Sequence, residues 1–164
     1  MKGQKRLLSF ARRACDDYNM ISPGDTVAVG LSGGKDSLAL LYTMAALRRF
    51  YPVPFRLIAV TIDMRFDEIG KSAADFGSIQ KLCRELDVEY HIEPSNIAKI
   101  VFDIRKESNP CSLCAKLRRG MLCDTAKKLG ANKIALGHHF DDAVQTFMLN
   151  LFYEGRLGCF SPVT

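Results

Sequence analysis

The feature that most constrains the fold is a β-rich run that leads through a glycine turn directly into a helical pattern. Residues 26–31 (TVAVGL) are apolar and largely β-branched, which is typical of a strand buried on both faces. The helical pattern extends over about 36–50, and Pro52 stops it. Runs of the same two kinds alternate along the rest of the chain, with strands over 55–62, 88–92 and 133–136 and helices over 3–19, 75–86, 111–129 and 141–153. This alternation predicts an α/β fold, a parallel twisted sheet flanked by helices.

The composition is that of one globular domain spanning residues 1–164. Hydrophobic residues make up 48% and charged residues 25%, which excludes a disordered or collagenous chain. The longest apolar run, 38–47, is half the roughly 20 residues that a membrane-spanning helix needs, and the basic N-terminus does not resemble a secretory signal. We therefore expect a cytoplasmic protein with no membrane partner. The net charge of +5 permits a polyanionic partner, but a merely soluble basic surface explains it more simply.

Two segments differ in how clearly they predict structure. Residues 95–107 show no decisive pattern. The helix predicted over 141–153 has the clearest helical period of the chain, because its apolar side chains fall on one stripe. The stripe consists of Phe140, Val144, Phe147, Met148, Leu151 and Phe152. We expect it to belong to the hydrophobic core.

The glycine turn has the composition of a phosphate-binding loop. It reads Ser32, Gly33, Gly34, Lys35, Asp36 and Ser37. Tandem glycines let the backbone approach an anion, the amides at the following helix N-terminus point at it, and a lysine and two hydroxyls add donors. The alternative is an ordinary glycine turn. The loop is not a Walker A motif, which needs a glycine at position 29 and a Ser or Thr at position 36, and it is not the GxGxxG dinucleotide fingerprint.

A second group of chemically informative residues is the cysteine pair Cys111 and Cys114. On a helix these thiols share one face with Arg118, whereas a stripe of Leu113, Leu117 and Met121 beside them is free to pack on the sheet. The helix N-terminus and nearby cationic side chains favour a lowered thiol pKa. Half of a zinc site, a redox dithiol, half of an iron–sulfur site and incidental core cysteines all fit this spacing.

Together these motifs resemble the tRNA 2-thiocytidine synthetase branch of the PP-loop ATP pyrophosphatases. The resemblance rests on their order, SGGKDS, then PCSLCAKLRRG, GHHFDD and LNLFYEG, over nearly the whole chain. It implies an adenine-nucleotide α-hydrolase fold, which is Rossmann-like, and cleavage of ATP between its α and β phosphates. It also implies that residues 32–37 bind ATP. A [4Fe–4S] cluster is implied on Cys111, Cys114 and a third cysteine expected beyond Thr164, so we expect the chain to be C-terminally truncated relative to the family.

The motif Gly137-His138-His139-Phe140-Asp141-Asp142 follows a predicted strand, at the edge where open α/β sheets bind ligands. Gly137 and His138 are candidates for the ATP pocket. Asp141 and Asp142 are candidate Mg²⁺ ligands, and Asp141 is a candidate catalytic residue together with the two cysteines. The alternative is that both aspartates only cap the helix. Asp63, which ends the second predicted strand, is a weaker ATP-pocket candidate. Family members often have Arg where this chain has Phe140.

The resemblance implies ATP-dependent thiolation of a tRNA cytidine: ATP adenylates the C2 oxygen of the base, and sulfur then displaces AMP. The implied partners are tRNA and a sulfur donor such as a cysteine desulfurase, while a homodimer stays open. Arg118 and Arg119 are RNA-contact candidates, although a solvated helix face fits them equally. The alternatives are a 2-thiouridine synthetase, an amide-forming adenylase, or a nucleotide-binding module without activity. We expect the remaining cysteines to be structural: Cys15, Cys83, Cys123 and Cys159.

Overall fold

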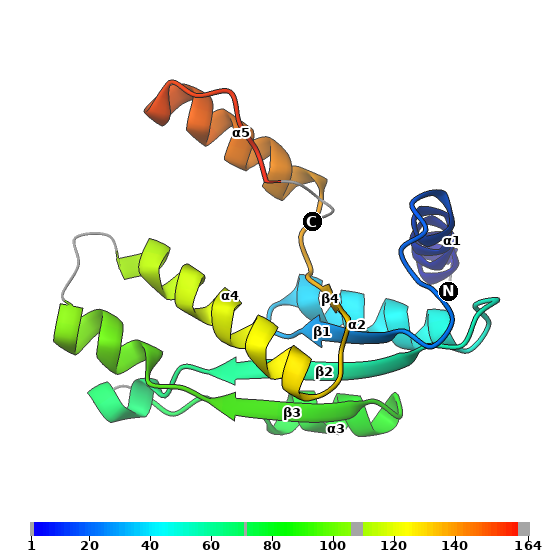
Figure 1. Cartoon of the computed structure of the whole chain (residues 1–164), viewed down its shortest axis with the longest axis horizontal. Helices are drawn as coiled ribbons and strands as arrows, with labels where there is room; N and C mark the ends of the chain where they lie inside the picture. The colour runs from blue at the N-terminus through cyan, green and yellow to red at the C-terminus, as the bar shows by residue number, and fades with distance from the viewer. Residues whose placement is uncertain (1, 71, 106–109, 161–164) are drawn as a thin grey trace.

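A computed structural model describes residues 2–70, 72–105 and 110–160 and has a parallel four-stranded sheet at its centre (Figure 1). The strand order is β3-β2-β1-β4, and the strands are β1 (Thr26–Gly30), β2 (Arg56–Asp63), β3 (Glu89–Pro94) and β4 (Lys133–Ala135). On one side Val27 pairs with Leu57, and on the other with Lys133. The predicted parallel sheet is confirmed, and it places the strand before the glycine loop at an interior position, paired on both edges.

Helices cover both faces of this sheet. They are α1 (Lys2–Asp17), α2 (Lys35–Arg48), α3 (Gly77–Glu85) and α4 (Pro110–Lys128), while the fifth helix, α5 (Phe140–Glu154), does not pack on the sheet. All five predicted helices are present. A 3-10 turn, η1 (Phe66–Ile69), was not predicted, and the undecided segment 95–107 contains a π-helical stretch, η2 (Lys99–Arg105), whereas residues 106 and 107 lie outside the described part. None of the helices in the described ranges is long and apolar enough to cross a membrane.

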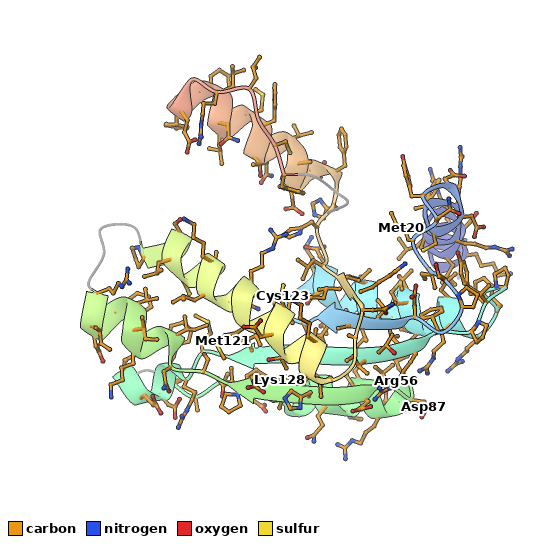
Figure 2. The ribbon with its side chains drawn as sticks, in the orientation of Figure 1. Met20, Arg56, Asp87, Met121, Cys123 and Lys128 are labelled. Atoms are coloured by element: carbon orange, nitrogen blue, oxygen red, sulfur yellow. The ribbon has the colours of Figure 1, made fainter. Side chains whose placement is uncertain are left out.

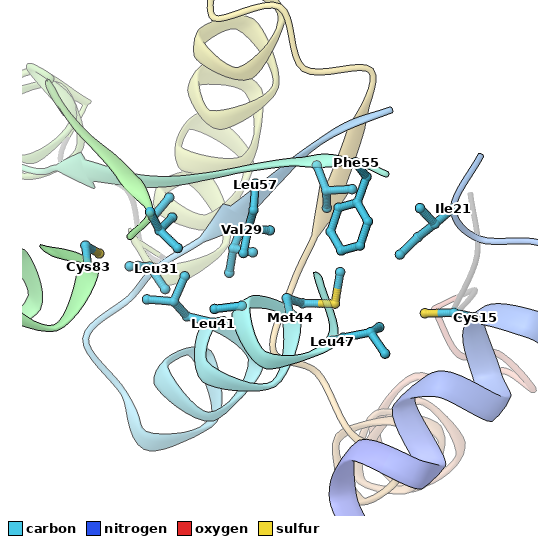
Figure 3. Close-up of a cluster of buried hydrophobic side chains, with 14 of the residues drawn as sticks. Cys15, Ile21, Val29, Leu31, Leu41, Met44, Leu47, Phe55, Leu57 and Cys83 are labelled. Atoms are coloured by element: carbon cyan, nitrogen blue, oxygen red, sulfur yellow. The ribbon is translucent and has the colours of Figure 1, made fainter. Parts of the chain in front are cut away.

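The alternating side chains of β1 and β2 divide the core into two clusters. Val29 and Leu57 point to the face where α1, α2 and α3 pack, and Figure 3 shows Leu41, Met44 and Leu47 of α2 facing them. Ala28, Ile58 and Val60 belong to the other cluster, which η2 and α4 cover with Val101, Leu122 and Ala126. Both faces of the two interior strands are therefore buried, as the sequence predicted.

The apolar stripe of α5 is not part of this core, so that prediction was wrong. α5 stands apart from the sheet (Figure 1), and none of its residues is buried. Phe140 is 79% exposed and Phe152 70% exposed, and the other four stripe residues are each more than a third exposed. The helical period shows that one face of a helix is apolar, but it does not say which element covers that face. In the described residues no element lies over it.

Candidate functional site

The glycine loop is shaped by hydroxyl groups of its own residues. The Ser37 side chain is only 5% exposed, and its Oγ donates to the Gly34 carbonyl at 2.9 Å. The same oxygen accepts from the Ser32 backbone N–H at 3.3 Å, and the Gly34 N–H reaches Ser32 Oγ at 3.4 Å. Gly33 has φ +80°, a conformation that favours glycine. Ser37 thus holds the turn, whereas the sequence suggested that its hydroxyl would donate to a phosphate.

The loop opens onto the N-terminus of α2, where backbone amides lack helical partners. The first helical hydrogen bond runs from Leu38 N–H to the Gly34 carbonyl at 3.2 Å, so the amides of the three preceding residues have no carbonyl within the helix. The N-cap Gly34 provides no side chain to accept from them. Free amides at the positive end of a helix dipole attract anions. The geometry therefore supports the predicted phosphate cradle.

Lys35 supplies an exposed cation beside this cradle. Its side chain is 87% exposed, and its Nζ lies 3.4 Å from Asp36 Oδ1. An ion pair so open to water contributes little to stability. The ammonium group is therefore available to an incoming phosphate at little cost to the fold.

A cleft of about 460 Å³ adjoins the loop, with walls from α2, α4, and the segment after β4. The predicted site residues that line it are Ser32, Gly34, Asp36, Ser37, Gly137, His138, Asp142, Arg118 and Arg119. The two arginines come from α4, so both predicted RNA-contact residues face the cleft that the phosphate loop borders. Gly33 and Lys35 belong to the same loop without lining the cleft.

An apolar set of residues also lines the cleft, and the sequence analysis did not single it out. It comprises Gly30, Leu31, Val60, Ile62, Ala115, Leu122 and Leu136. Gly30 and Ile62 lie near the carboxyl ends of β1 and β2, the edge where open α/β sheets place their ligands. That rule is the signal by which the sequence could have identified Gly30 and Ile62 as lining residues.

Gly137 brings the segment after β4 against the loop itself. A Cβ on this glycine would lie 2.8 Å from Ser37 N and 2.9 Å from the Asp36 carbonyl carbon, closer than real Cβ atoms approach backbone. Any side chain here would push the segment away from the first turn of α2. Gly137 is thus required for close packing between the two motifs.

Asp142 caps α5, as one of the two sequence interpretations held. Its Oδ2 accepts the His139 backbone N–H at 2.8 Å. The His139 ring lies between two carboxylates, 3.6 Å from Asp142 Oδ2 and 3.9 Å from Asp36 Oδ2. These contacts join the first turns of α2 and α5. Asp141 is exposed and does not line the cleft.

Asp63 has a local structural role at the end of β2. Its Oδ1 accepts the Arg65 backbone N–H at 2.9 Å, and its carbonyl accepts from the backbone and the hydroxyl of Ser95. Asp63 does not line the cleft. Its hydrogen bonds fix the turn that follows β2.

The cysteine pair lies at the start of α4, outside the residues that line the cleft. Cys111 is exposed, whereas Cys114 is half-buried and packs on the second core cluster beside Leu113 and Leu117, as predicted for that leucine stripe. Met121 lies further along α4 and packs on the same cluster (Figure 2). Burial raises the pKa of Cys114 despite the opposing charge of Arg118, so the expected lowering is wrong for this thiol.

The other four cysteines differ in their surroundings. Cys15 and Cys83 are buried in the first core cluster, and burial raises the pKa of both thiols, of Cys83 to about 11. This confirms their structural role. Cys159 is exposed, its Sγ–H donates to the Ala143 carbonyl at 3.2 Å, and it belongs to neither of the two core clusters. Cys123 is partly buried.

Comparison with known families matches residues 5–159 to the PP-loop domain. The chain belongs to the PP-loop family. Relatives of this PP-loop domain include the tRNA-cytidine(32) 2-sulfurtransferases of Teredinibacter turnerae, 46% identical over 98% of this chain and 52% of that protein, and of Geobacter sulfurreducens, 41% identical over 96% and 60%. The chain spans about half the length of the relatives it matches.

Solved structures agree with this assignment. The U34-tRNA thiolase NcsA from Methanococcus maripaludis, determined with its [4Fe–4S] cluster, superposes with a TM-score of 0.70 at 28% identity, over 94% of this chain and 52% of that one. An NH3-dependent NAD synthetase from Campylobacter jejuni shares the fold, with a TM-score of 0.51 at 17% identity over 93% and 74%. The predicted adenine-nucleotide α-hydrolase fold is confirmed.

Proposed function

We propose that this PP-loop domain binds ATP and adenylates the C2 oxygen of a tRNA cytidine, which a sulfur nucleophile then replaces. The observation that carries the proposal is the glycine loop, whose free amides at the start of α2 border a cleft lined by Arg118 and Arg119. The names of the relatives supply the reaction class and the target, cytidine 32. tRNA, a sulfur donor such as a cysteine desulfurase, and a cytoplasmic location belong to the same proposal.

The proposed reaction has two steps, adenylation of the base and displacement of AMP by sulfur. In the first, the C2 oxygen forms a bond to the α-phosphorus of ATP, and the bond from that phosphorus to the bridging oxygen breaks, so that pyrophosphate leaves. The loop amides and Lys35 would hold the negative charge of the departing pyrophosphate, with the arginines of α4 lining the adjoining cleft. In the second, sulfur bonds to C2 and AMP leaves with the former base oxygen.

Carboxylates of the site fit a magnesium ion only in part. Asp142 uses Oδ2 as a helix cap, and both Asp142 and Asp36 line the cleft. Oxygen donors of this kind suit Mg²⁺ when phosphate oxygens complete the shell. Asp142 and Asp36 would hold such an ion, which would supply charge neutralisation on the phosphates, whereas the exposed Asp141 lies outside the cleft lining. No cluster of three His, Cys, Asp or Glu side chains able to hold a metal occurs in the part of the chain that the structure describes.

The two thiols of α4 supply part of the ligand set for a [4Fe–4S] cluster. Cys111 is exposed and Cys114 lies one helical turn away, so both sulfurs can face one ligand. The third cysteine is expected outside these residues. When bound, the cluster supplies an open iron position for sulfur. The chain itself contributes the two thiolates and the nearby charge of Arg118.

The proposal is tested with a chimera. The matched part of the Teredinibacter turnerae relative is replaced by this chain, which aligns with it over 162 residues. The chimera is incubated anaerobically with iron, sulfide, Mg-ATP and unmodified tRNA, and the tRNA nucleosides are identified by mass spectrometry. We expect 2-thiocytidine, and none when Lys35→Ala is introduced.

Two results would contradict this proposal. If 2-thiouridine forms instead, the target nucleoside is wrong and the thiolase alternative holds. If the chimera binds ATP and the unaltered relative thiolates tRNA, but the chimera releases no pyrophosphate with tRNA, the chain is a nucleotide-binding module without this activity.

A further inference from the structure

The cysteine pair has a third sulfur atom close by, which comes from a different part of the chain. Cys114 Sγ lies 4.0 Å from the thioether Sδ of Met64. Met64 directly follows β2, so 50 residues of chain separate the two side chains. Both pack on the second core cluster.

The backbone around Met64 is fixed in place. Its carbonyl accepts the Ala98 N–H at 3.3 Å, and the preceding Asp63 accepts from Arg65 through its carboxylate. Arg65 itself has φ +53°, a left-handed conformation that a non-glycine residue adopts at a cost. These hydrogen bonds fix the backbone at the position from which the Met64 thioether contacts Cys114 of α4.

Cys111 is a further sulfur donor on the same helix face as Cys114. It precedes Cys114 by three residues on α4, which places the two Cβ atoms about 5–6 Å apart on one face. It is also exposed, so an ion can reach the group from solvent. No histidine or carboxylate is found with the pair among the described residues, since no cluster of three such ligands occurs there. The donors are therefore all soft.

We propose that Met64, Cys111 and Cys114 form a three-sulfur site that binds one monovalent soft metal ion of the copper(I) class. Thiolate and thioether sulfurs select copper(I), which accepts low coordination numbers, whereas hard divalent ions need oxygen donors. Binding exchanges the two thiol protons for one Cu⁺ and changes no oxidation state. The inference goes beyond the proposed function, because it requires neither ATP nor tRNA, and it makes copper(I) a competitor for the thiols that the proposed cluster needs.

The test is an anaerobic titration of the reduced chain with copper(I) against bicinchoninate, a coloured competitor for this ion. We expect one equivalent to bind tightly and Cys111→Ser to abolish that binding. Met64→Leu preserves side-chain volume and should weaken the affinity about tenfold or more. Met121→Leu is the matched control, since Met121 packs on the same cluster, and should bind like the wild type.

X-ray absorption at the copper edge gives a second readout. Three sulfur neighbours are expected in the wild type and two in Met64→Leu. A Cys159→Ser variant removes the other exposed thiol and should leave both measurements unchanged. The proposal is wrong if Met64→Leu binds copper(I) as tightly as the wild type while circular dichroism shows that both proteins are folded. It is also wrong if only two sulfur atoms surround copper in the wild type, or if Cys111→Ser still binds one equivalent of copper(I).

Discussion

At the scale of single residues, the loop 32–37 contains one residue that shapes its turn and another whose side chain is exposed and can contact a ligand. Ser37 is buried and bonded within the loop, whereas Lys35 extends into solvent. Replacing Lys35 should therefore change ligand binding without changing the fold.

We predict that Lys35→Ala lowers the affinity for ATP about ten- to hundredfold, because charge-assisted contacts to phosphate contribute roughly 1.5–3 kcal/mol. Isothermal titration calorimetry measures the affinity, and thermal unfolding should be unchanged. Lys128→Ala, at the far end of α4 (Figure 2), is the control for a general loss of positive charge. Equal ATP affinity in wild type and Lys35→Ala would show that this loop does not bind the phosphates of ATP.

A second residue-scale feature is the buried carboxylate that connects β1 to the segment before β4. Asp25 accepts from Ser22 N–H at 2.7 Å and Asn132 Nδ2 at 2.6 Å, and Lys133 Nζ lies 2.9 Å away. The hydrogen bond from Ser22, followed by those from Lys133 and Asn132, lowers the pKa of Asp25 from 3.8 to about 2. In the unfolded chain this carboxyl binds its proton at a higher pH, so its contribution to stability is present above pH 4 and lost as the pH falls toward 2.

Asp25→Asn should accordingly lower the free energy of unfolding by about 1–3 kcal/mol at pH 7, because Lys133 and two neutral donors lose a charged acceptor. The difference between wild type and variant should shrink between pH 4 and pH 2. Urea unfolding at several pH values measures both effects. A difference that stays constant down to pH 2 would contradict the lowered pKa.

At the scale of elements, the site depends on contact between the segment after β4 and the first turn of α2. Gly137→Ala places a methyl group against the backbone of Ser37 and Asp36. We expect this overpacking to destabilise the domain by about 1–3 kcal/mol and to weaken ATP binding, since α2 must shift. Gly120→Ala in α4 is the matched control, because a methyl group at that position would meet no atom within 4 Å apart from its chain neighbours and the nearby backbone of its own helix, and helix propensity there favours alanine by about 1 kcal/mol.

Chemical denaturation and calorimetry on the two glycine variants make the comparison. Gly120→Ala should be as stable as wild type or more stable, and should bind ATP equally. Wild-type ATP affinity in Gly137→Ala would show that the contact does not position the loop.

The exposed face of α5 predicts that truncating one of its large side chains has little effect on stability. Truncating a buried leucine such as Leu122 should cost about 2–5 kcal/mol, whereas Phe152→Ala should change the free energy of unfolding of this chain by less than about 0.5 kcal/mol. Binding of a dye for exposed apolar surface should fall in Phe152→Ala. A loss of several kcal/mol in this variant would show that the stripe is buried after all.

Most elements could be predicted from the sequence, since hydrophobic period and turn residues are local signals. Strands such as 26–31 are indicated by their β-branched residues, and the loop by its glycines. The position of α5 could not be predicted, because the pattern of its residues is the same whether the stripe is covered or not. The location of Arg118 in the cleft, and the burial that raises the pKa of Cys114, depend on how α4 lies across the sheet. The spacing of residues along the sequence carries no information about such long-range packing.

At the scale of the whole molecule, the family assignment determines which bond of ATP should break. In the chimera with the Teredinibacter turnerae relative, Mg-ATP and tRNA should yield AMP and pyrophosphate, because the proposed role of the loop is to hold the pyrophosphate as a unit. Ion-exchange chromatography of the spent nucleotide measures the products. ADP and inorganic phosphate as main products would place the chain with kinases or ordinary ATPases instead.

The position of β1 between β2 and β4 also matters while the chain is being made. The bond from Thr26 N–H to Asn132 Oδ1 joins residues 106 positions apart, and the β1–β4 pairing is of similar reach. A ribosome must therefore synthesise more than four-fifths of these 164 residues before the second edge of β1 can pair. Until then a nascent chain presents an open edge of an apolar strand, which is prone to aggregate. Gly137, which lines the cleft and packs against the first turn of α2, is synthesised at the end of that interval.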